Sequence, residues 1–290
     1  MFKGAFTAII TPFKNDKVDY ETFERLIEFQ IENGIDGLVP VGTTGESPTL
    51  NHHEHKDVIK FVVDRVGGRV PVIAGTGSNS TAEAVELTDF ARKAGVTASL
   101  QVCPYYNKPT QEGLYRHFKA INDAVDLPIV LYNIPGRCGG DGLAPETIAR
   151  LNELEQVVAV KEATGSMDQA SEILSMCDIT ILSGDDSMTL PLCSLGGKGV
   201  VSVVANIVPA DVKSLTDSLL AGDFAAGLEM HRKLFRLSKS LLNMATNPIP
   251  IKAAMEIMSM SSDEMRLPMV SLSQEEKTVL RGYLQDYGLI

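Results

Sequence analysis

The 290-residue sequence has few cysteines, and none of the four belongs to a CxxC pair. Cys103, Cys138, Cys177 and Cys193 lie far apart along the chain, which is typical of reduced thiols and unlike a disulfide framework or a zinc site. We therefore expect a cytoplasmic protein without a structural metal.

A secretion signal and membrane-spanning segments are also missing from the pattern. The stretch MFKGAFTAIITPF carries one lysine, and its short apolar run ends at Pro12. It lacks the long apolar region and small-residue cleavage site of a signal peptide. No apolar run reaches the length of a transmembrane helix, so no membrane association is expected.

Positive charge is in the minority. Lysine and arginine number 26 against 37 aspartate and glutamate residues, which gives a net charge of −11. Nucleic acids and anionic membranes select basic surfaces, so neither is an expected partner. A small anionic substrate remains compatible, because it needs only one local cation.

What the chain does contain is a repeated alternation of short apolar runs and amphipathic segments. Eight runs predict strands, namely GAFTAIITPF, IDGLVPVG, VPVIAGTG, ASLQVCPYY, PIVLYNIP, VVAVKEATG, DITILSGDD and GVVSVVANI. The intervening segments predict helices at 20–33, 51–66, 81–94, 111–125, 145–151, 167–177, 186–195 and 209–221. Eight strand–helix units close an α/β protein into a (β/α)8 or TIM barrel. A doubly wound open sheet is the alternative, with one ligand crevice.

Beyond residue 222 the pattern is helical only. Helices are predicted at 223–243, 248–260 and 273–287, packed on the barrel as additional C-terminal helices. We therefore divide the chain into a catalytic barrel, residues 1–222, and a C-terminal helical extension, residues 223–290.

Lys161 is the most unusual residue of the predicted strands, because it follows an unbroken apolar run in VVAVKEATG. One interpretation is that its stem packs in the core while the ammonium reaches water. The other is catalytic, because a shielded amine is more often uncharged and can form a Schiff base with a carbonyl substrate. Glu162 should point to the opposite face of the strand.

Other polar residues follow neighbouring strands at the same end, where the chemistry of a (β/α)8 barrel lies. They are Thr43 and Thr44 in GTTGES, Tyr106, Tyr132 and Arg137. Hydroxyl groups can relay protons, turn amides can hold a carboxylate, and the arginine fork suits a carboxylate. Each group also has a structural interpretation. The threonines can form a tight turn, the tyrosines can fill the top of the barrel, and the arginine can be a solvated surface charge.

Three further motifs favour structure over a cofactor. In NHHEH, His52 and His55 have a spacing compatible with metal, but no carboxylate or cysteine set completes a site. Asn51 and Glu54 instead predict a capping box at a helix start. GTGSNS lacks the third glycine of a dinucleotide motif, and GGKGV is not a phosphate loop.

These motifs together resemble the dihydrodipicolinate synthase family of the pyruvate-dependent Schiff-base aldolases, a superfamily that includes sialic acid lyase. The stretches that carry the resemblance are GTTGES, CPYYNKPTQEGLY, YNIPGR, VKEATG and NPIPIKAAM, in this order over essentially the whole chain. GTTGE and KEATG resemble motifs shared by the superfamily as a whole. Arg137 after YNIPG resembles the pattern of the synthase branch.

The resemblance implies that Lys161 condenses with pyruvate and that the resulting enamine attacks L-aspartate 4-semialdehyde. Ring closure then displaces the lysine and releases 4-hydroxy-tetrahydrodipicolinate, the first committed step toward diaminopimelate and lysine. It also implies that no metal or organic cofactor takes part.

The same resemblance implies roles for the other residues at the strand ends. Thr43, Tyr132 and Tyr106 match a proton relay, with Tyr106 reaching in from a neighbouring subunit of a homotetramer built as a dimer of dimers. Substrate contacts are implied for Thr44, for Arg137 and for the main-chain carbonyl of Val203.

The family also binds lysine as a feedback inhibitor in a cleft between subunits. The matching residues here are Ser47, His52, His55, Asn79, Glu83 and Tyr105.

Two positions depart from the family pattern. Pro48 stands beside this site where a small residue is common, which bears on the strength of inhibition. Cys138 replaces a usual threonine after Arg137, which bears on the loop that binds the semialdehyde.

The nearest alternative is another aldolase of the superfamily, N-acetylneuraminate lyase or a keto-deoxy-sugar aldolase. Such an enzyme would keep Lys161 and Tyr132 but would not need Arg137. A different hypothesis is a barrel protein that binds amino acids as a sensor and catalyses nothing. Such a protein should lack the nucleophile, so Lys161 weighs against it. A metal-dependent aldolase is disfavoured because the histidines cluster at one helix start.

Overall fold

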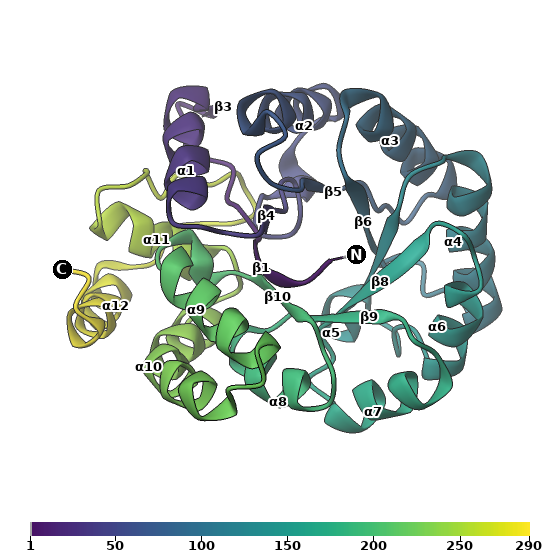
Figure 1. The fold of residues 1–290 in the computed structure, drawn as a ribbon. Coiled ribbons are helices and arrows are strands. Elements are labelled where there is room, and N and C mark those ends of the chain that lie inside the picture. The colour runs from purple at the N-terminus through teal and green to yellow at the C-terminus, as the bar shows by residue number, and fades with distance from the viewer. Residues whose placement is uncertain (1) are drawn as a thin grey trace.

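Eight parallel strands form a nearly closed barrel in the computed structural model, which describes residues 2–290 (Figure 1). A bridge between Leu38 and Val72 links the two ends of the sheet. In order of pairing the strands are β4 (Gly37–Leu38), β1 (Gly4–Thr7), β10 (Gly199–Ser202), β9 (Thr180–Ser183), β8 (Val157–Glu162), β7 (Ile129–Asn133), β6 (Ala98–Val102) and β5 (Ile73–Gly75). The predicted (β/α)8 barrel is confirmed, and the open doubly wound sheet is not observed.

Helices between the strands form the outer ring of the barrel (Figure 1). They are α1 (Tyr20–Glu32), α2 (His52–Val66), α3 (Thr81–Ala94), α4 (Gln111–Ala124), α6 (Pro145–Asn152), α7 (Met167–Met176), α8 (Thr189–Ser194) and α9 (Pro209–Leu220). Asn51 caps α2, and the side chain of Glu54 returns a hydrogen bond to the main chain of Asn51, so the predicted capping box is present.

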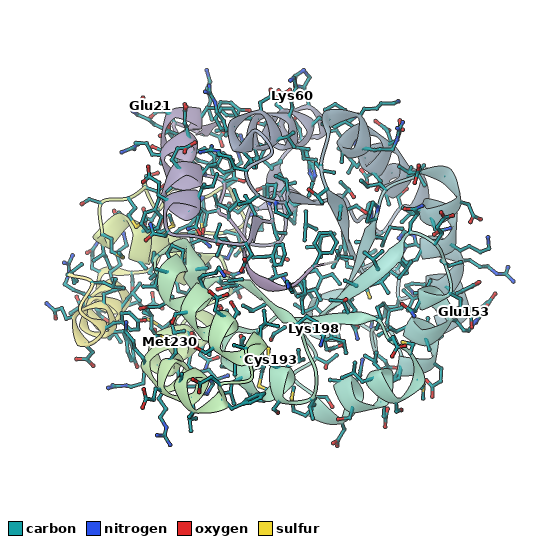
Figure 2. All side chains as sticks on the ribbon, in the orientation of Figure 1. Glu21, Lys60, Glu153, Cys193, Lys198 and Met230 are labelled. Carbon is teal, nitrogen blue, oxygen red and sulfur yellow. The ribbon has the colours of Figure 1, made fainter. Side chains whose placement is uncertain are left out.

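The unbroken apolar strand runs reflect burial on both faces. Val130 of β7 and Ala159 of β8 belong to the cluster that fills the barrel interior. Leu131 and Val160, the next residue of each strand, pack outward against the helices. On the outer surface of the ring of helices, Figure 2 shows the charged side chain of Lys60 of α2 pointing away from the barrel.

Several short elements were not predicted, because they lack a long periodic pattern. β2 (Phe13–Lys14) and β3 (Lys17–Val18) form an antiparallel hairpin outside the barrel. The one-turn helix α5 (Pro135–Cys138) follows β7. The helix predicted over 186–195 is divided into a 3₁₀ turn, η2 (Asp186–Met188), and α8, with the Asp185 side chain accepting from the main-chain N–H of Ser187.

The C-terminal helices are α10 (Phe224–Asn243), α11 (Ile249–Ile257) and α12 (Gln274–Tyr287). α10 packs on α9, and α12 packs on α10 and α11 (Figure 1). The loop after α11 reaches back to the barrel, because Arg266 donates to Glu54 of α2 at 2.6 Å and 2.8 Å. The division of the chain at residue 222 stays a prediction. Within residues 2–290 no helix has the length and apolar character to cross a membrane.

Candidate active site

Lys161 lies inside the barrel near the carboxyl end of β8. It stands opposite Tyr132 of β7 in the parallel register, and only 6% of its surface is exposed. Its Nζ is 4.0 Å from the centre of the Tyr132 ring. A side chain at Gly184 would place its Cβ 3.2 Å from Lys161 Cε, so this glycine leaves room for the lysine stem. The amine is therefore shielded within the barrel rather than directed along its outer wall.

Glu162, the next residue, takes the opposite face of the strand. Its carboxylate accepts from Asn133 Nδ2 at 3.1 Å and from the main-chain N–H of Thr164 at 2.8 Å. Burial raises the pKa of Glu162 above its usual value. These contacts hold the carboxylate outside the barrel interior.

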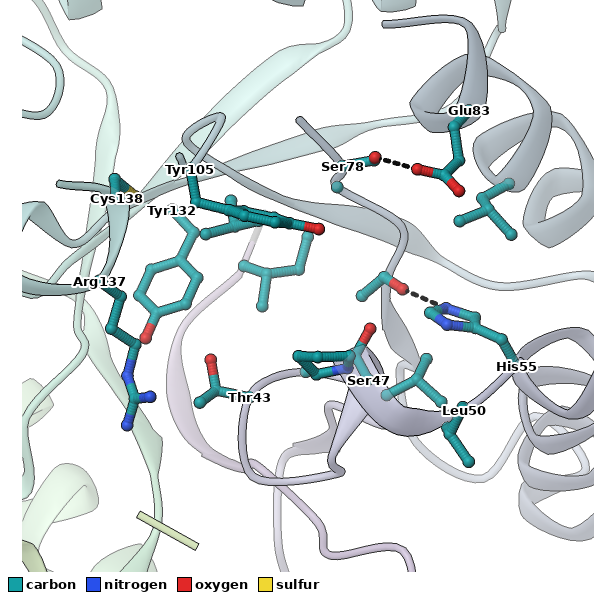
Figure 3. Close-up of a pocket in the computed structure, with 18 of the residues that line it drawn as sticks. Thr43, Ser47, Leu50, His55, Ser78, Glu83, Tyr105, Tyr132, Arg137 and Cys138 are labelled. Atoms are coloured by element: carbon teal, nitrogen blue, oxygen red, sulfur yellow. Dashed lines mark hydrogen bonds between the residues drawn. The ribbon is translucent and has the colours of Figure 1, made fainter. Parts of the chain in front are cut away.

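A cavity of about 330 Å³ opens at this end of the barrel. Figure 3 shows Thr43, Tyr132 and Arg137 gathered on one side of it. His55 and Glu83 lie on the other side, and the cavity is continuous between the two groups. The structure thus brings together side chains that the sequence assigns to two different sites.

The GTTGES turn is held in place by a residue between α10 and α11. Asn247 Nδ2 donates to Thr44 Oγ1 at 3.0 Å, and Arg137 Nη2 donates to the Asn247 carbonyl at 3.1 Å. Asn247 therefore bridges the turn after β4 and the α5 helix after β7. Thr44 is buried behind the cavity and does not line it, whereas Thr43 does.

A buried ion pair joins the same turn to α11. Lys252 is fully buried and donates to a carboxylate oxygen of Glu46 and to the carbonyl of Glu264, the latter at 2.7 Å. The main-chain N–H of Arg266 donates to the second Glu46 oxygen at 3.3 Å. Burial lowers the pKa of Lys252, and the Glu46 carboxylate opposes that effect. Sequence reasoning missed this pair, although a lone charge in the apolar run IPIKAAM is a signal for it.

Val203 directly follows β10, and both its main-chain N–H and its carbonyl are hydrogen-bonded. Its carbonyl accepts from Asn206 N at 3.1 Å and Nδ2 at 2.9 Å. Its N–H donates to the Asp186 carboxylate at 3.0 Å, which also accepts from Ser202 Oγ at 2.5 Å. Burial raises the pKa of Asp186 to about 6. The Val203 carbonyl is thus rigidly placed, with its hydrogen-bonding capacity used by Asn206.

Five of the six residues predicted for lysine binding line the cavity, namely Ser47, His52, His55, Glu83 and Tyr105. The Glu83 carboxylate accepts from Ser78 Oγ and lies 2.5 Å from His52 Nε2. Asn79, the sixth, stands behind the lining and donates to the Tyr105 carbonyl at 3.2 Å. Pro48 is itself part of the cavity wall.

His55 has a defined protonation state in this wall. Its Nε2 is 2.7 Å from the Gly75 carbonyl, an acceptor that requires the proton on this nitrogen. Burial lowers the pKa of His55, so the ring is neutral near pH 7.

The chain does not bring Tyr106 to its own cavity, and the predicted site residues Lys161, Thr44, Asn79 and Val203 are also absent from the residues that line it. Tyr106 is 90% exposed, with a left-handed φ of 72°, and lies outside the cavity lining. Among residues 2–290, no three His, Cys, Asp or Glu side chains are grouped closely enough to hold a metal ion.

Comparison with known proteins points to one family. A profile of the Dihydrodipicolinate synthetase family matches residues 1–287. The 4-hydroxy-tetrahydrodipicolinate synthase of Geobacter sulfurreducens is 53% identical over 292 residues, covering 100% of both chains. A chloride-inhibited dihydrodipicolinate synthase from Acinetobacter baumannii, solved with pyruvate, is 41% identical with a TM-score of 0.97, covering 100% of both chains. The synthase from Cyanidioschyzon merolae, solved with lysine bound, is 40% identical with a TM-score of 0.95, covering 100% of this chain and 99% of that one.

Proposed function

The chain belongs to the dihydrodipicolinate synthetase family, and we propose that Lys161 is the amine on which it binds pyruvate as a Schiff base. The protein is a Schiff-base-forming lyase that condenses pyruvate with L-aspartate 4-semialdehyde. The product, 4-hydroxy-tetrahydrodipicolinate, leads to diaminopimelate and lysine. The observation that carries the lysine assignment is the shielded Nζ, 4.0 Å from the Tyr132 ring at the barrel mouth.

The mechanism begins with attack of the uncharged Lys161 amine on the keto carbon of pyruvate, and water leaves to give an imine. Loss of a methyl proton converts the imine to an enamine, whose carbon attacks the semialdehyde carbonyl. The substrate amine then attacks the imine carbon, closes the ring and frees Lys161.

Proton transfer is assigned to the hydroxyl groups of Thr43 and Tyr132, which line the same side of the cavity. Tyr106 completes this relay from a neighbouring subunit, and the exposed position of its side chain on its own chain supports that role. The assembly in which this occurs is a homotetramer formed from two dimers.

Replacing Tyr132 with phenylalanine is expected to lower kcat by about 10²-fold or more, because a positioned proton donor is lost while the ring is kept. Turnover with pyruvate and the semialdehyde measures the loss. Borohydride trapping of pyruvate should still label Lys161, though more slowly. A kcat within threefold of the parent protein would remove Tyr132 from the relay.

Arg137 is assigned to the carboxylate of the semialdehyde, because it lines the cavity beside Thr43 and Tyr132 and donates a hydrogen bond to the Asn247 carbonyl. An Arg137→Lys variant keeps the positive charge but cannot make a bidentate pair of hydrogen bonds to the carboxylate. We expect its KM for the semialdehyde to rise about tenfold or more with little change in KM for pyruvate. A parallel rise in both KM values would contradict the assignment.

The reaction itself is tested with two acceptor aldehydes. Pyruvate with L-aspartate 4-semialdehyde should turn over rapidly, and pyruvate with N-acetylmannosamine should not. The family and the names of its relatives favour the first acceptor over the sugar of N-acetylneuraminate lyase. Faster turnover with the sugar would overturn the assignment of substrate.

Lysine is assigned to the part of the cavity lined by Ser47, His52, His55, Glu83 and Tyr105. The Glu83 carboxylate supplies the negative charge that an amine requires, and the lysine-bound relative from Cyanidioschyzon merolae supports this ligand. Asn79 contributes by holding the Tyr105 main chain. Pro48 stiffens the wall of the site.

The cellular location assigned to the enzyme is the cytoplasm.

A Glu83→Gln variant is expected to bind lysine about tenfold more weakly, because the amine loses a charge-assisted partner. Calorimetric titration of lysine into the parent and variant proteins measures this difference. An exposed glutamate on the far side of the barrel, Glu153, provides the matched Glu→Gln control. No heat of lysine binding to the parent protein would remove the regulatory assignment.

A further inference from the structure

Cys103 and Cys138 lie side by side behind the active-site cavity, although they are 35 residues apart in the sequence. In its protonated form the Cys138 thiol donates to the main-chain carbonyl of Cys103 at 3.1 Å. Both residues are buried, and each lies close in the sequence to an assigned site residue, Tyr105 for Cys103 and Arg137 for Cys138. Cys103 directly follows β6, and Cys138 ends α5, the helix of Arg137.

A second cavity of about 480 Å³ lies beside both cysteines. Cys103 and Cys138 line it, and its rim includes exposed residues such as Lys108 and Asp141, so small molecules can enter from solvent. Cys138 also lines the active-site cavity. Its side chain therefore stands in the wall between a solvent-accessible pocket and the substrate site.

We propose that Cys103 and Cys138 form a dithiol modification site that reacts with small disulfides and closes to an internal disulfide. The effect on activity, but not the bond itself, rests on the assignment of Arg137 to the semialdehyde carboxylate. Cys177 and Cys193 lie elsewhere in the fold and take no part.

The order of reaction follows from the environment of the two sulfurs. The contact between the two thiol side chains lowers the pKa of Cys138, whereas the same contact and burial raise the pKa of Cys103. The Cys138 thiolate attacks one sulfur of the incoming disulfide and expels a thiolate. The Cys103 sulfur then attacks Cys138, expels the second thiolate and completes the bond. The two protein thiols lose two protons and two electrons, and the incoming disulfide is reduced to two thiols.

Closure of this bond acts on the substrate site through α5. That helix is a single turn, held by hydrogen bonds from the main-chain N–H groups of Arg137 and Cys138 to the Ile134 carbonyl. Drawing Cys138 toward β6 therefore turns the residue before it away from Asn247, its present hydrogen-bond partner. We expect weaker semialdehyde binding and unchanged formation of the Schiff base on Lys161.

The test incubates the reduced, full-length enzyme with oxidised glutathione, followed by thiol titration and peptide mass mapping under non-reducing conditions. Two of the four thiols should disappear, with loss of two hydrogen atoms from a peptide pair that joins Cys103 and Cys138. The KM for the semialdehyde should rise about tenfold, and dithiothreitol should restore it. Borohydride trapping of pyruvate on Lys161 should be unaffected.

Two variants separate this site from general oxidation. Cys103→Ser lacks the resolving sulfur, so its Cys138 should stop at a mixed disulfide with glutathione. Cys177→Ser should respond as the parent protein does. The proposal is overturned if all four thiols of the parent survive the treatment, or if the internal disulfide forms without a change in KM. Loss of pyruvate trapping in the untreated enzyme would instead count against the proposed function.

Discussion

Substituting Lys161 with arginine is expected to lower kcat by on the order of 10⁴-fold or more, because the reaction loses its nucleophile. Arginine keeps the positive charge and a long stem, but its guanidinium stays protonated and forms no Schiff base. The parent protein, reduced with borohydride in the presence of pyruvate, should carry one adduct that peptide mapping assigns to Lys161. The variant should carry none.

The control for this experiment is Lys198→Arg, which makes the same change at an exposed residue before β10, at the opposite end of the barrel. This variant should keep full turnover and full labelling. Thermal unfolding of both variants shows whether the fold is retained. A borohydride adduct on any other lysine, or turnover by Lys161→Arg within tenfold of the parent, would overturn the assignment of the nucleophile.

Much of the fold could be predicted because it depends on local periodicity. All eight predicted strand runs contain an observed barrel strand, and the amphipathic segments form helices close to the predicted bounds. The elements that were missed are short. The β2–β3 hairpin depends on Asn15 and Asp16 at φ values of 53° and 60°, and no periodic pattern signals a two-residue strand.

The residues of the candidate site could be predicted from the sequence, but the contacts that hold them in place could not. A barrel gathers residues from the ends of its strands, so Thr43, Tyr132, Lys161 and Arg137 could be placed at one rim from strand order alone. The bridge made by Asn247 could not, because it joins segments more than a hundred residues apart. Contacts of that kind depend on tertiary packing, which leaves no periodic trace in the sequence.

The buried pair of Lys252 and Glu46 is the support with the largest expected effect on stability. Replacing Lys252 with methionine should lower the free energy of unfolding by about 3–5 kcal/mol, because the Glu46 carboxylate is then buried without its partner. The Thr43–Thr44 turn, which is separated from Glu46 only by Gly45, should also loosen and lower kcat. Urea unfolding and steady-state turnover measure the two effects.

A double variant, Lys252→Met with Glu46→Gln, distinguishes the lost pair from lost packing. It removes both charges while the glutamine can still accept from the main-chain N–H of Arg266, as Glu46 does. Most of the stability should return, because no uncompensated charge remains. Lys60→Met, which breaks an exposed ion pair with Asp64, should cost only about 0–1 kcal/mol. If the single Lys252 variant loses no more free energy of unfolding than Lys60→Met, the ion pair does not anchor the Thr43–Thr44 turn to the C-terminal helices.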